Sequence, residues 1–355
     1  MIWRPGILAA IILVGGCSSS AMNSANDDSD AGAIDAGSGS FSDAGAHSDS
    51  GVASSGDSGT NATCGLRGGT RGLSSRSISV NGTTRTYLAY LPASVDASKP
   101  VPFVFVFHGY LMSGQQMHDI TGYSKIADTD GVAVVFPDGE SGPDSILPPW
   151  NVESSGETVC GAGQIENASG DDFAFMDAMK GDVLQDQCID DAHVFATGFS
   201  MGGYLSHHIA CHRSDVRAVA PHSSGTVASL TACTTGHTPM IIFHGLSDPT
   251  IAPGCDDPSS AAQAGYPASA ALWAAKNGCK STSTAVSTNG SGGGDGTCFL
   301  YDGCPADGQV ELCTFSAMTH CWAGGDSSGE GSGSACPTYA SATELEWSFF
   351  KTYAW

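Results

Sequence analysis

One short segment constrains the fold of this chain more than any other: residues 193–199 are strand-like and run into Ser200, with Gly198 before it and Gly202 after it. This G-x-S-x-G pattern is typical of a serine on a sharp turn between a strand and a helix. The glycines remove side chains that would collide with neighbouring backbone, and they tolerate strained torsions. A helix beginning at Gly202 would direct free N–H groups at an anion formed beside the serine. The segment therefore predicts that Ser200 is a nucleophile.

Strand-like and helix-like segments alternate through the rest of the chain. Residues 101–107 and 132–136 are continuous apolar runs, as expected of strands buried on both faces. Residues 117–128 and 172–185 have helical spacing. Further strands are expected at residues 85–92, 218–220, 240–243 and 310–315, a further helix at 343–353, and mainly disulfide-held loop in the rest of 281–336. Such alternation predicts an α/β fold with a doubly wound, mostly parallel sheet.

The first part of the chain does not have the composition of a folded domain. Residues 1–17 hold one cation, an apolar run and a final Cys17, which resembles a bacterial lipoprotein signal with a lipidated cysteine. An ordinary export signal with an incidental Cys17 is the alternative. Residues 18–63 are rich in Ser, Gly, Ala and Asp and lack Lys and Arg, which predicts a disordered, flexible linker. Residues 64–355 are then one domain outside the cytoplasm, either a periplasmic or outer-surface lipoprotein or a secreted protein.

Cysteine content and charge exclude several classes of function. Setting Cys17 aside leaves an even number of the 13 cysteines, none in a C-x-x-C pair, so we expect disulfides and no metal site. The expected pairs are Cys211 with Cys233, Cys279 with Cys304, and Cys321 with Cys336. A net charge of −23 argues against nucleic acid as a partner. A lipid at Cys17 would be the only link to a membrane.

A nucleophilic serine on such a sheet needs an acid that follows it along the chain, at the carboxyl end of a strand. Asp248 fits this requirement, because it lies in the loop directly after the apolar run 240–243. Asp256, Asp257 and Asp302 are the alternatives. A turn or helix-cap role is the alternative for Asp248 itself.

The base must come later still, and His320 follows the strand expected at residues 310–315. His237 precedes a strand and would lie at the wrong end of the sheet, while His244 ends a strand before the acid. His320 is therefore the candidate base. Loop, surface or packing roles are expected for the other histidines, His108 and His222 among them.

Two backbone N–H groups are needed to hold an oxyanion beside the serine. We expect one from Met201, directly after the serine, and the other from Tyr110, in the loop after the first buried strand. Trp150 and Trp322 are the candidates for contact with a substrate, and a place in the core is the alternative for Trp150.

At these residues the chain resembles a known family. His108-Gly, Gly198-Phe-Ser-Met-Gly-Gly203, His244-Gly-Leu-Ser-Asp248 and His320-Cys-Trp-Ala-Gly-Gly325 are similar to motifs of the secreted feruloyl esterases, acetylxylan esterases and poly(3-hydroxybutyrate) depolymerases. The resemblance spans roughly residues 85–325. It implies an α/β-hydrolase fold, no cofactor and a Ser200, Asp248 and His320 triad. The substrate would be an ester, either a feruloyl or acetyl ester of plant polysaccharide or a hydroxyalkanoate polyester.

The chain also departs from the family pattern. Cys-Trp-Ala-Gly follows His320 where the family has Trp-Pro-Gly, so the resemblance does not carry substrate specificity. Two other functions are the alternatives: a serine peptidase on the same fold, and a non-catalytic lipoprotein that binds a polymer.

Overall fold

The computed structural model describes most of the domain expected after the linker. The described residues are 64–140, 150–152, 158–159, 163–164, 170–226, 230–251, 266–288, 296–326 and 335–353. The predicted signal at residues 1–17, its Cys17 and the predicted linker at 18–63 lie outside them. No helix within the described ranges is long and apolar enough to cross a bilayer.

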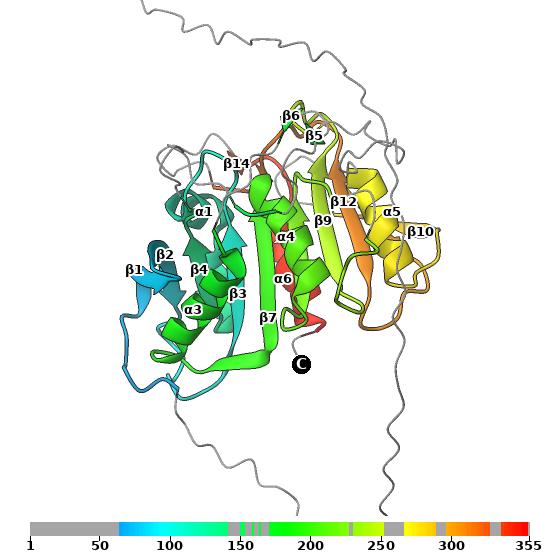
Figure 1. The fold of residues 1–355 in the computed structure, drawn as a ribbon. Coiled ribbons are helices and arrows are strands. Elements are labelled where there is room, and N and C mark those ends of the chain that lie inside the picture. The colour runs from blue at the N-terminus through cyan, green and yellow to red at the C-terminus, as the bar shows by residue number, and fades with distance from the viewer. Residues whose placement is uncertain are drawn as a thin grey trace, which may run out of the picture. The chain divides into compact units, whose positions relative to one another are not determined.

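A ten-stranded sheet crosses the domain in the order β1-β2-β4-β3-β7-β8-β9-β12-β11-β10 (Figure 1). The strands are β1 (Gly72–Val80), β2 (Thr83–Leu91), β3 (Val101–Phe107), β4 (Ala133–Pro137), β7 (Ile189–Phe199), β8 (Ala218–His222), β9 (Met240–Gly245), β10 (Ser283–Ser287), β11 (Gly296–Tyr301) and β12 (Val310–Phe315). The six strands from β4 to β12 in this order are parallel, and the outer pairs are antiparallel. Short two-stranded sheets join β5 (Thr158–Val159) with β6 (Gly163–Gln164) and β13 (Trp322–Ala323) with β14 (Ala335–Cys336).

Helices cover both faces of this sheet. They are α1 (Gly114–Thr121), α2 (Tyr123–Asp130), α3 (Asp172–Leu184), α4 (Met201–His212), α5 (Tyr266–Lys276) and α6 (Ala342–Lys351). In Figure 1, α3, α4 and α5 lie in front of the sheet and α6 lies behind it. The buried side chains divide accordingly into one core beneath α3, α4 and α5 and another beneath α1, α2 and α6. The predicted doubly wound α/β-hydrolase fold is confirmed.

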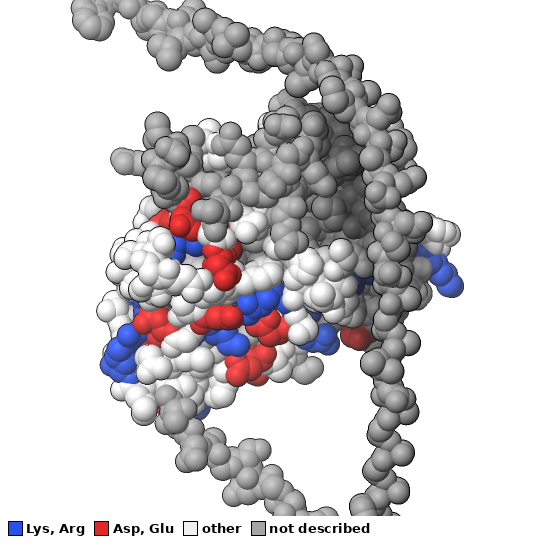
Figure 2. Space-filling view, in the orientation of Figure 1, with Lys and Arg blue, Asp and Glu red and all other residues white. Residues whose placement is uncertain are grey.

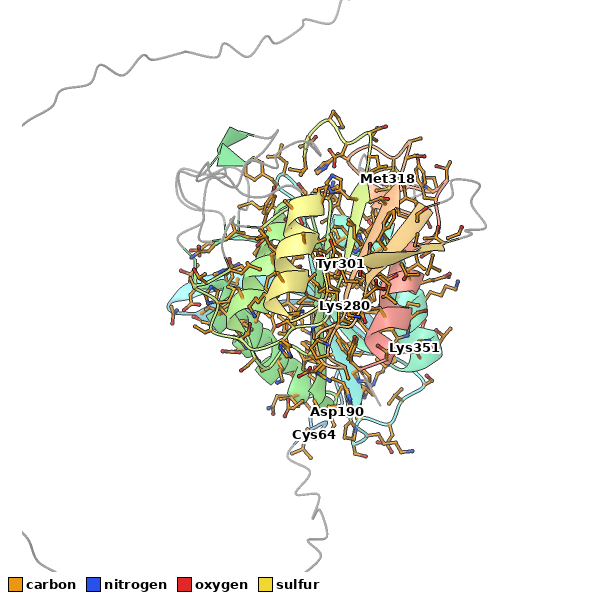
Figure 3. The ribbon with its side chains drawn as sticks, turned by 90° about the vertical axis from the view of Figure 1, so that its right-hand side faces the viewer. Cys64, Asp190, Lys280, Tyr301, Met318 and Lys351 are labelled. Carbon is orange, nitrogen blue, oxygen red and sulfur yellow. A yellow bond between two sulfur atoms is a disulfide. The ribbon has the colours of Figure 1, made fainter. Side chains whose placement is uncertain are left out.

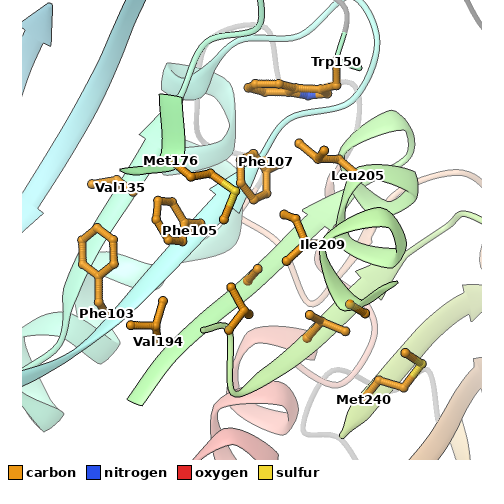
Figure 4. Packing of buried hydrophobic residues seen from close by; sticks show 14 of the residues in the cluster. Phe103, Phe105, Phe107, Val135, Trp150, Met176, Val194, Leu205, Ile209 and Met240 are labelled. Atoms are coloured by element: carbon orange, nitrogen blue, oxygen red, sulfur yellow. The ribbon is translucent and has the colours of Figure 1, made fainter. Parts of the chain in front are cut away.

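The apolar run in β3 explains how one strand serves both cores. Every residue of β3 is buried. Because successive side chains of a strand point to opposite faces, Phe103, Phe105 and Phe107 enter the core beneath α4, while Val104 and Val106 enter the other. Figure 4 shows the three phenylalanines in the first core. A strand with apolar residues on both faces therefore belongs in the centre of the sheet.

Two predictions of secondary structure were wrong. Residues 117–128 are not one helix but parts of α1 and α2, because Gly122 between them has a φ of 72°, which glycine adopts without strain. The region 281–336 contains β10 and β11 in addition to the predicted strand at 310–315. β10 is exposed along its whole length, so no buried apolar pattern marks it in the sequence.

Five disulfides lie among the described residues. They join Cys64 to Cys188, Cys211 to Cys233, Cys279 to Cys304, Cys298 to Cys313 and Cys321 to Cys336. The three predicted pairs are therefore confirmed. Two further cysteines, Cys160 and Cys255, lie outside the described residues. Disulfides in this number indicate a protein that folds in an oxidising compartment, outside the cytosol.

Charged side chains are interleaved on the face shown in Figure 2, without a patch of one sign. Among the described residues, Arg213 lies 2.5 Å from Asp177 and 2.6 Å from Asp215. Lys180 lies 2.7 Å from Asp191. Acidic and basic groups of the described residues therefore form local ion pairs on these elements.

Candidate active site

Three neighbouring loops at the carboxyl edge of the sheet carry the predicted triad. Ser200 follows β7, Asp248 follows β9 and His320 follows β12. These strands and β8 are consecutive in the sheet, so their carboxyl ends meet at one edge. Figure 3 shows Met318, two residues before His320, at the end of the molecule opposite Asp190, which lies at the start of β7.

The structure brings the three predicted side chains into one hydrogen-bonded series. His320 Nε2 lies 3.0 Å from Ser200 Oγ, and His320 Nδ1 lies 2.7 Å from Asp248 Oδ2. The Asp248 carboxylate is fully buried, whereas the His320 side chain is 18% exposed. This is the geometry required of a nucleophile, its base and the group that orients the base.

The charge state of Asp248 follows from its surroundings. Burial alone would raise the pKa of Asp248, but the hydrogen bond and charge of His320 and the backbone N–H of Ile251 together lower it below its usual value. Oδ1 accepts hydrogen bonds from the N–H groups of Thr250 at 2.8 Å and Ile251 at 2.9 Å. An ionised carboxylate accepts the Nδ1 proton of His320, which leaves the Nε2 lone pair facing Ser200.

The alternative acids do not join this series. The Asp302 carboxylate accepts hydrogen bonds from Thr282 Oγ1 at 2.6 Å and Thr284 Oγ1 at 3.0 Å, at the outer strands of the sheet. Asp256 and Asp257 lie outside the described residues. Of the two described candidates for the acid, Asp248 and Asp302, only Asp248 is hydrogen-bonded to His320.

The alternative bases have other partners. His237 Nδ1 lies 3.1 Å from Asp307 Oδ1, and His237 precedes β9, at the edge opposite the candidate site. His244 Nε2 lies 3.0 Å from the carbonyl oxygen of Ile251, and burial lowers the pKa of His244 to about 4. His244 is therefore neutral at neutral pH and packs behind Asp248, 3.7 Å from Oδ2.

The turn that carries Ser200 needs its glycines for steric reasons. Ser200 has a φ of 54° and a ψ of −115°, and α4 begins at the next residue, one before the predicted start. A Cβ on Gly198 would lie 2.3 Å from the carbonyl oxygen of Gly202, and a Cβ on Gly202 would lie 2.4 Å from that of Phe107. The Ser200 N–H donates to the carbonyl oxygen of His222 at 2.9 Å. The strained backbone thus holds the hydroxyl away from the sheet.

The two predicted oxyanion donors belong to segments that adjoin the serine: Met201 follows it in the chain, and Tyr110 follows Gly109 in the loop after β3. A Cβ on Gly109 would lie 3.1 Å from Ser200 Cβ, so the loop after β3 packs directly against the nucleophile. A tight turn closes this loop, with the Met112 N–H donating to Gly109 O at 3.1 Å. The N–H groups of Tyr110 and Met201 donate to no other described residue. Both are therefore available to an oxygen atom of a substrate.

His108 fixes the conformation of the loop after β3, which carries Gly109 and Tyr110 and is called the oxyanion loop below. Its Nδ1–H donates to Gly109 O at 2.8 Å, and its Nε2 accepts the N–H of Gly139 at 2.9 Å. Burial lowers the pKa of His108 to about 4, so the ring is neutral and keeps this tautomer. Trp150 Nε1 donates to the His108 carbonyl oxygen at 2.8 Å. The predicted loop role of His108 agrees with these contacts.

The structure buries both tryptophans that were predicted to contact a substrate, and Trp150 has the place in the core that was its alternative. Trp150 is fully buried and packs edge-on to Phe107 in the core, as Figure 4 shows. Trp322 is also fully buried, stacks on His222 at 3.7 Å and donates from Nε1 to Thr343 Oγ1 at 3.0 Å. Each indole has an apolar ring and a polar N–H group, and each N–H group donates a hydrogen bond within the protein.

Exposed apolar side chains flank the candidate site instead. Tyr110 and Leu111 on the oxyanion loop are 42% and 55% exposed. Leu246, on the loop after β9 that carries Asp248, is 41% exposed. Gly245 packs so closely against the next loop that a Cβ there would lie 2.2 Å from Met318 O. Sequence reasoning did not identify Leu111 or Leu246, because an apolar residue in a loop carries no signal of exposure.

One group within the described residues has the spacing of metal ligands. Single atoms of Cys298, Glu311 and Cys313 lie within 4.8 Å of one another. The two sulfur atoms form a disulfide, so they are not free to bind an ion.

Comparisons with known proteins reveal similarity to feruloyl esterases. No family model matches the chain. Feruloyl esterase C of Emericella nidulans is 30% identical over 224 residues, which cover 60% of this chain and 69% of the relative. Feruloyl esterase D of Neurospora crassa is 33% identical over 175 residues, 48% of this chain and 55% of the relative. A solved acetyl xylan esterase from Aspergillus awamori is 16% identical with a TM-score of 0.49, covering 70% of this chain and 94% of that one.

Proposed function

This chain belongs to the feruloyl esterase family of α/β-hydrolases and is a carboxylic ester hydrolase, and we propose that it cleaves feruloyl esters of plant polysaccharide with Ser200 as the nucleophile. The hydrogen-bonded series from Asp248 through His320 to Ser200 carries this proposal. The matched segments span 69% of the first relative and 55% of the second, so the substrate belongs to the proposal.

The reaction has two steps. His320 Nε2 takes the proton of Ser200 Oγ as that oxygen attacks the ester carbonyl. The carbon–oxygen bond to the alcohol breaks, the alcohol leaves with the proton from His320, and an acyl group remains on Ser200. A water molecule then attacks the acyl group, loses a proton to His320 and releases the acid as the serine regains its proton. Asp248 keeps Nδ1 protonated and stabilises the positive charge on His320.

The tetrahedral intermediates of both steps carry a negative oxygen. The N–H groups of Tyr110 and Met201 donate to no other described residue, which supports their assignment as the donors to this oxygen. Removing one such donor from a serine hydrolase typically costs about 100- to 1000-fold in turnover. The fixed loop around His108 keeps the Tyr110 N–H in place without reorganisation during the reaction.

The acyl group is inferred from the exposed apolar side chains. β3 and β9 lie on opposite sides of β7 in the sheet, so Tyr110 and Leu111 lie on one side of Ser200 and Leu246 on the other. Burial of apolar surface contributes about 25 cal/mol per Å². A feruloyl group covers much more of these side chains than an acetyl group does. We therefore expect higher kcat/KM for feruloyl esters.

The location of the protein is supported by two features. The disulfides favour an extracellular protein. For the finer location, we propose a lipid on Cys17 with residues 18–63 as the tether, on the basis of the sequence. Metabolic labelling with a palmitate analogue tests this: the wild-type chain should be labelled and Cys17→Ser should not, whereas equal labelling would contradict lipidation at Cys17.

A substrate panel tests the proposed function. Wild-type protein should hydrolyse methyl ferulate and feruloylated oligosaccharide faster than 4-nitrophenyl acetate, poly(3-hydroxybutyrate) or a peptide amide. Ser200→Ala should abolish hydrolysis and labelling by a fluorophosphonate, while Ser348→Ala on the surface of α6 should retain both. Full activity in Ser200→Ala would contradict the mechanism, and a preference for acetate or for the polyester would contradict the proposed acyl group.

A further inference from the structure

We infer that His222, held by the buried carboxylate of Glu346, is a positioning residue. It fixes the relative positions of the three loops that carry Ser200, Asp248 and His320. The inference rests on the proposed function, because it takes Ser200, Asp248 and His320 as the reacting groups and their orienter. His222 itself does not touch the reacting atoms. It acts through the backbone and side chains that carry them.

His222 ends β8 and contacts the elements that carry all three members of the triad. Its carbonyl oxygen accepts the N–H of Ser200 at 2.9 Å. Its ring stacks on Phe243 of β9, the strand that leads to Asp248, with centroids 4.4 Å apart. The other face of the ring stacks on Trp322, two residues after His320, with centroids 3.7 Å apart. The orientation of this single ring therefore bears on the nucleophile, the acid and the base together.

Glu346 of α6 fixes the orientation of that ring. The Glu346 side chain is fully buried, and its Oε2 accepts the His222 Nε2–H at 2.6 Å. Tyr123 Oη donates to Oε1 at 2.5 Å, and Thr197 Oγ1 of β7 lies 2.9 Å from Oε2. A buried carboxylate is costly unless every lone pair finds a partner. Glu346, His222, Tyr123 and Thr197 thus form a closed polar cluster within an apolar core, behind the turn that carries Ser200.

The cluster restricts His222 in a way that packing alone does not. Two flat aromatic neighbours leave a ring free to slide and rotate between them, whereas a hydrogen bond to a fixed carboxylate permits one orientation. If the ring shifts, the His222 carbonyl and Trp322 shift with it. The separation of Ser200 Oγ and His320 Nε2 then changes. A displacement of about 1 Å at a reacting group costs on the order of 100-fold in rate.

Two variants break the contact in different ways. Glu346→Gln keeps the size and shape of the side chain but removes its charge. His222→Phe keeps a ring between Phe243 and Trp322 but removes the N–H donor. We expect kcat to fall about 10- to 100-fold in each with KM within twofold, because neither residue contacts the substrate. His222→Gln restores an amide donor to Oε2 and should recover part of the lost kcat.

Tyr123→Phe is the matched control. It removes the hydrogen bond to Oε1 of the same carboxylate, but it leaves the bond between His222 Nε2 and Oε2 in place. We expect a lower melting temperature and a smaller loss of kcat than in Glu346→Gln, because His222 keeps its own hydrogen bond to Oε2. A purely structural role for the cluster predicts instead that Tyr123→Phe and Glu346→Gln lose stability and activity in parallel.

The measurements are kcat and KM on methyl ferulate, the melting temperature, and the rate of fluorophosphonate labelling per titrated active site. The titration restricts every comparison to folded protein, so partial misfolding of a variant does not hide the result. A wild-type labelling rate and kcat in Glu346→Gln and His222→Phe would overturn the inference, as would equal losses of kcat in Tyr123→Phe. The proposed function fails separately, if Ser200→Ala retains hydrolysis.

Discussion

His320 Nδ1 lies 2.7 Å from Oδ2 of Asp248, with no other described side chain contacting that nitrogen. The other carboxylate oxygen accepts two backbone N–H groups of its own loop. The carboxylate is therefore held by groups that do not depend on His320, and it can impose one tautomer on the imidazole.

Asp248→Asn tests this relationship. The amide would favour the wrong tautomer of His320, so kcat should fall by about 10,000-fold with little change in KM. The measurement is steady-state hydrolysis of a feruloyl ester. Asp302→Asn is the control, because Asp302 binds only threonine hydroxyls among the described side chains and should retain kcat within twofold. A comparable loss in both variants would refute the special role of Asp248.

Trp150→Phe separates a supporting role from substrate stacking. The change removes the N–H that donates to the His108 carbonyl and leaves an aromatic ring in the core. If Trp150 supports the oxyanion loop, kcat should fall by about 10-fold or more with KM unchanged. A rise in KM alone would indicate stacking on the substrate. Trp273→Phe, which loses a comparable hydrogen bond to His207 Nδ1, should leave kcat unchanged.

The disulfide that follows His320 should matter for activity beyond its contribution to stability. Cys321–Cys336 and Cys298–Cys313 both span a sequence separation of 15 residues, so each restricts the unfolded chain to a similar degree, about 3 kcal/mol. Replacing either pair with alanine should lower the urea midpoint comparably. Only the loss of Cys321–Cys336, next to the base, should also reduce kcat, by about 10-fold. Equal kcat values in the two double variants would contradict this.

Asp182 should make the fold sensitive to acid. Burial raises the pKa of Asp182, but hydrogen bonds from Arg67, Tyr87 and Arg76 outweigh it and lower the value to about 2. Because the folded pKa lies below the ordinary value of 3.8, the group stabilises the fold above pH 3.8, and this contribution is lost as the pH falls from 3.8 towards 2.

The urea midpoint measured between pH 7 and pH 2 checks this expectation. Asp182→Asn should be less stable than wild type at pH 7, and the difference should shrink below pH 3.8. Asp191→Asn is the control. The Asp191 side chain is 73% exposed, so its ion pair with Lys180 should contribute little to stability at any pH. A difference between wild type and Asp182→Asn that stays constant down to pH 2 would show that the lost contacts are not charge-dependent.

Sequence patterns predicted the elements that carry strong local signals. β3 is apolar at every position, and the glycines around Ser200 and the Asp-Pro after β9 mark loops at the ends of buried strands. The same approach missed β1 and β10, where half or all of the side chains are exposed and the strands depend on pairing with their neighbours. It also left Trp150 undecided between a substrate contact and the core and assigned Trp322 to the substrate, because a tryptophan near a motif has the same sequence signal whether it faces solvent or the core.

The sequence by itself determined the α/β alternation, the order of serine, acid and histidine along the chain, and the even number of cysteines besides Cys17 that predicts disulfides. These depend on residue type and spacing within short segments. Only the tertiary structure decided that His222 and Glu346, 124 residues apart, form a buried pair behind the turn that carries Ser200, and that Leu246 is exposed to solvent. The reason is physical: burial and hydrogen-bond partners are set by which strands become neighbours in the sheet. That arrangement is a property of the whole chain.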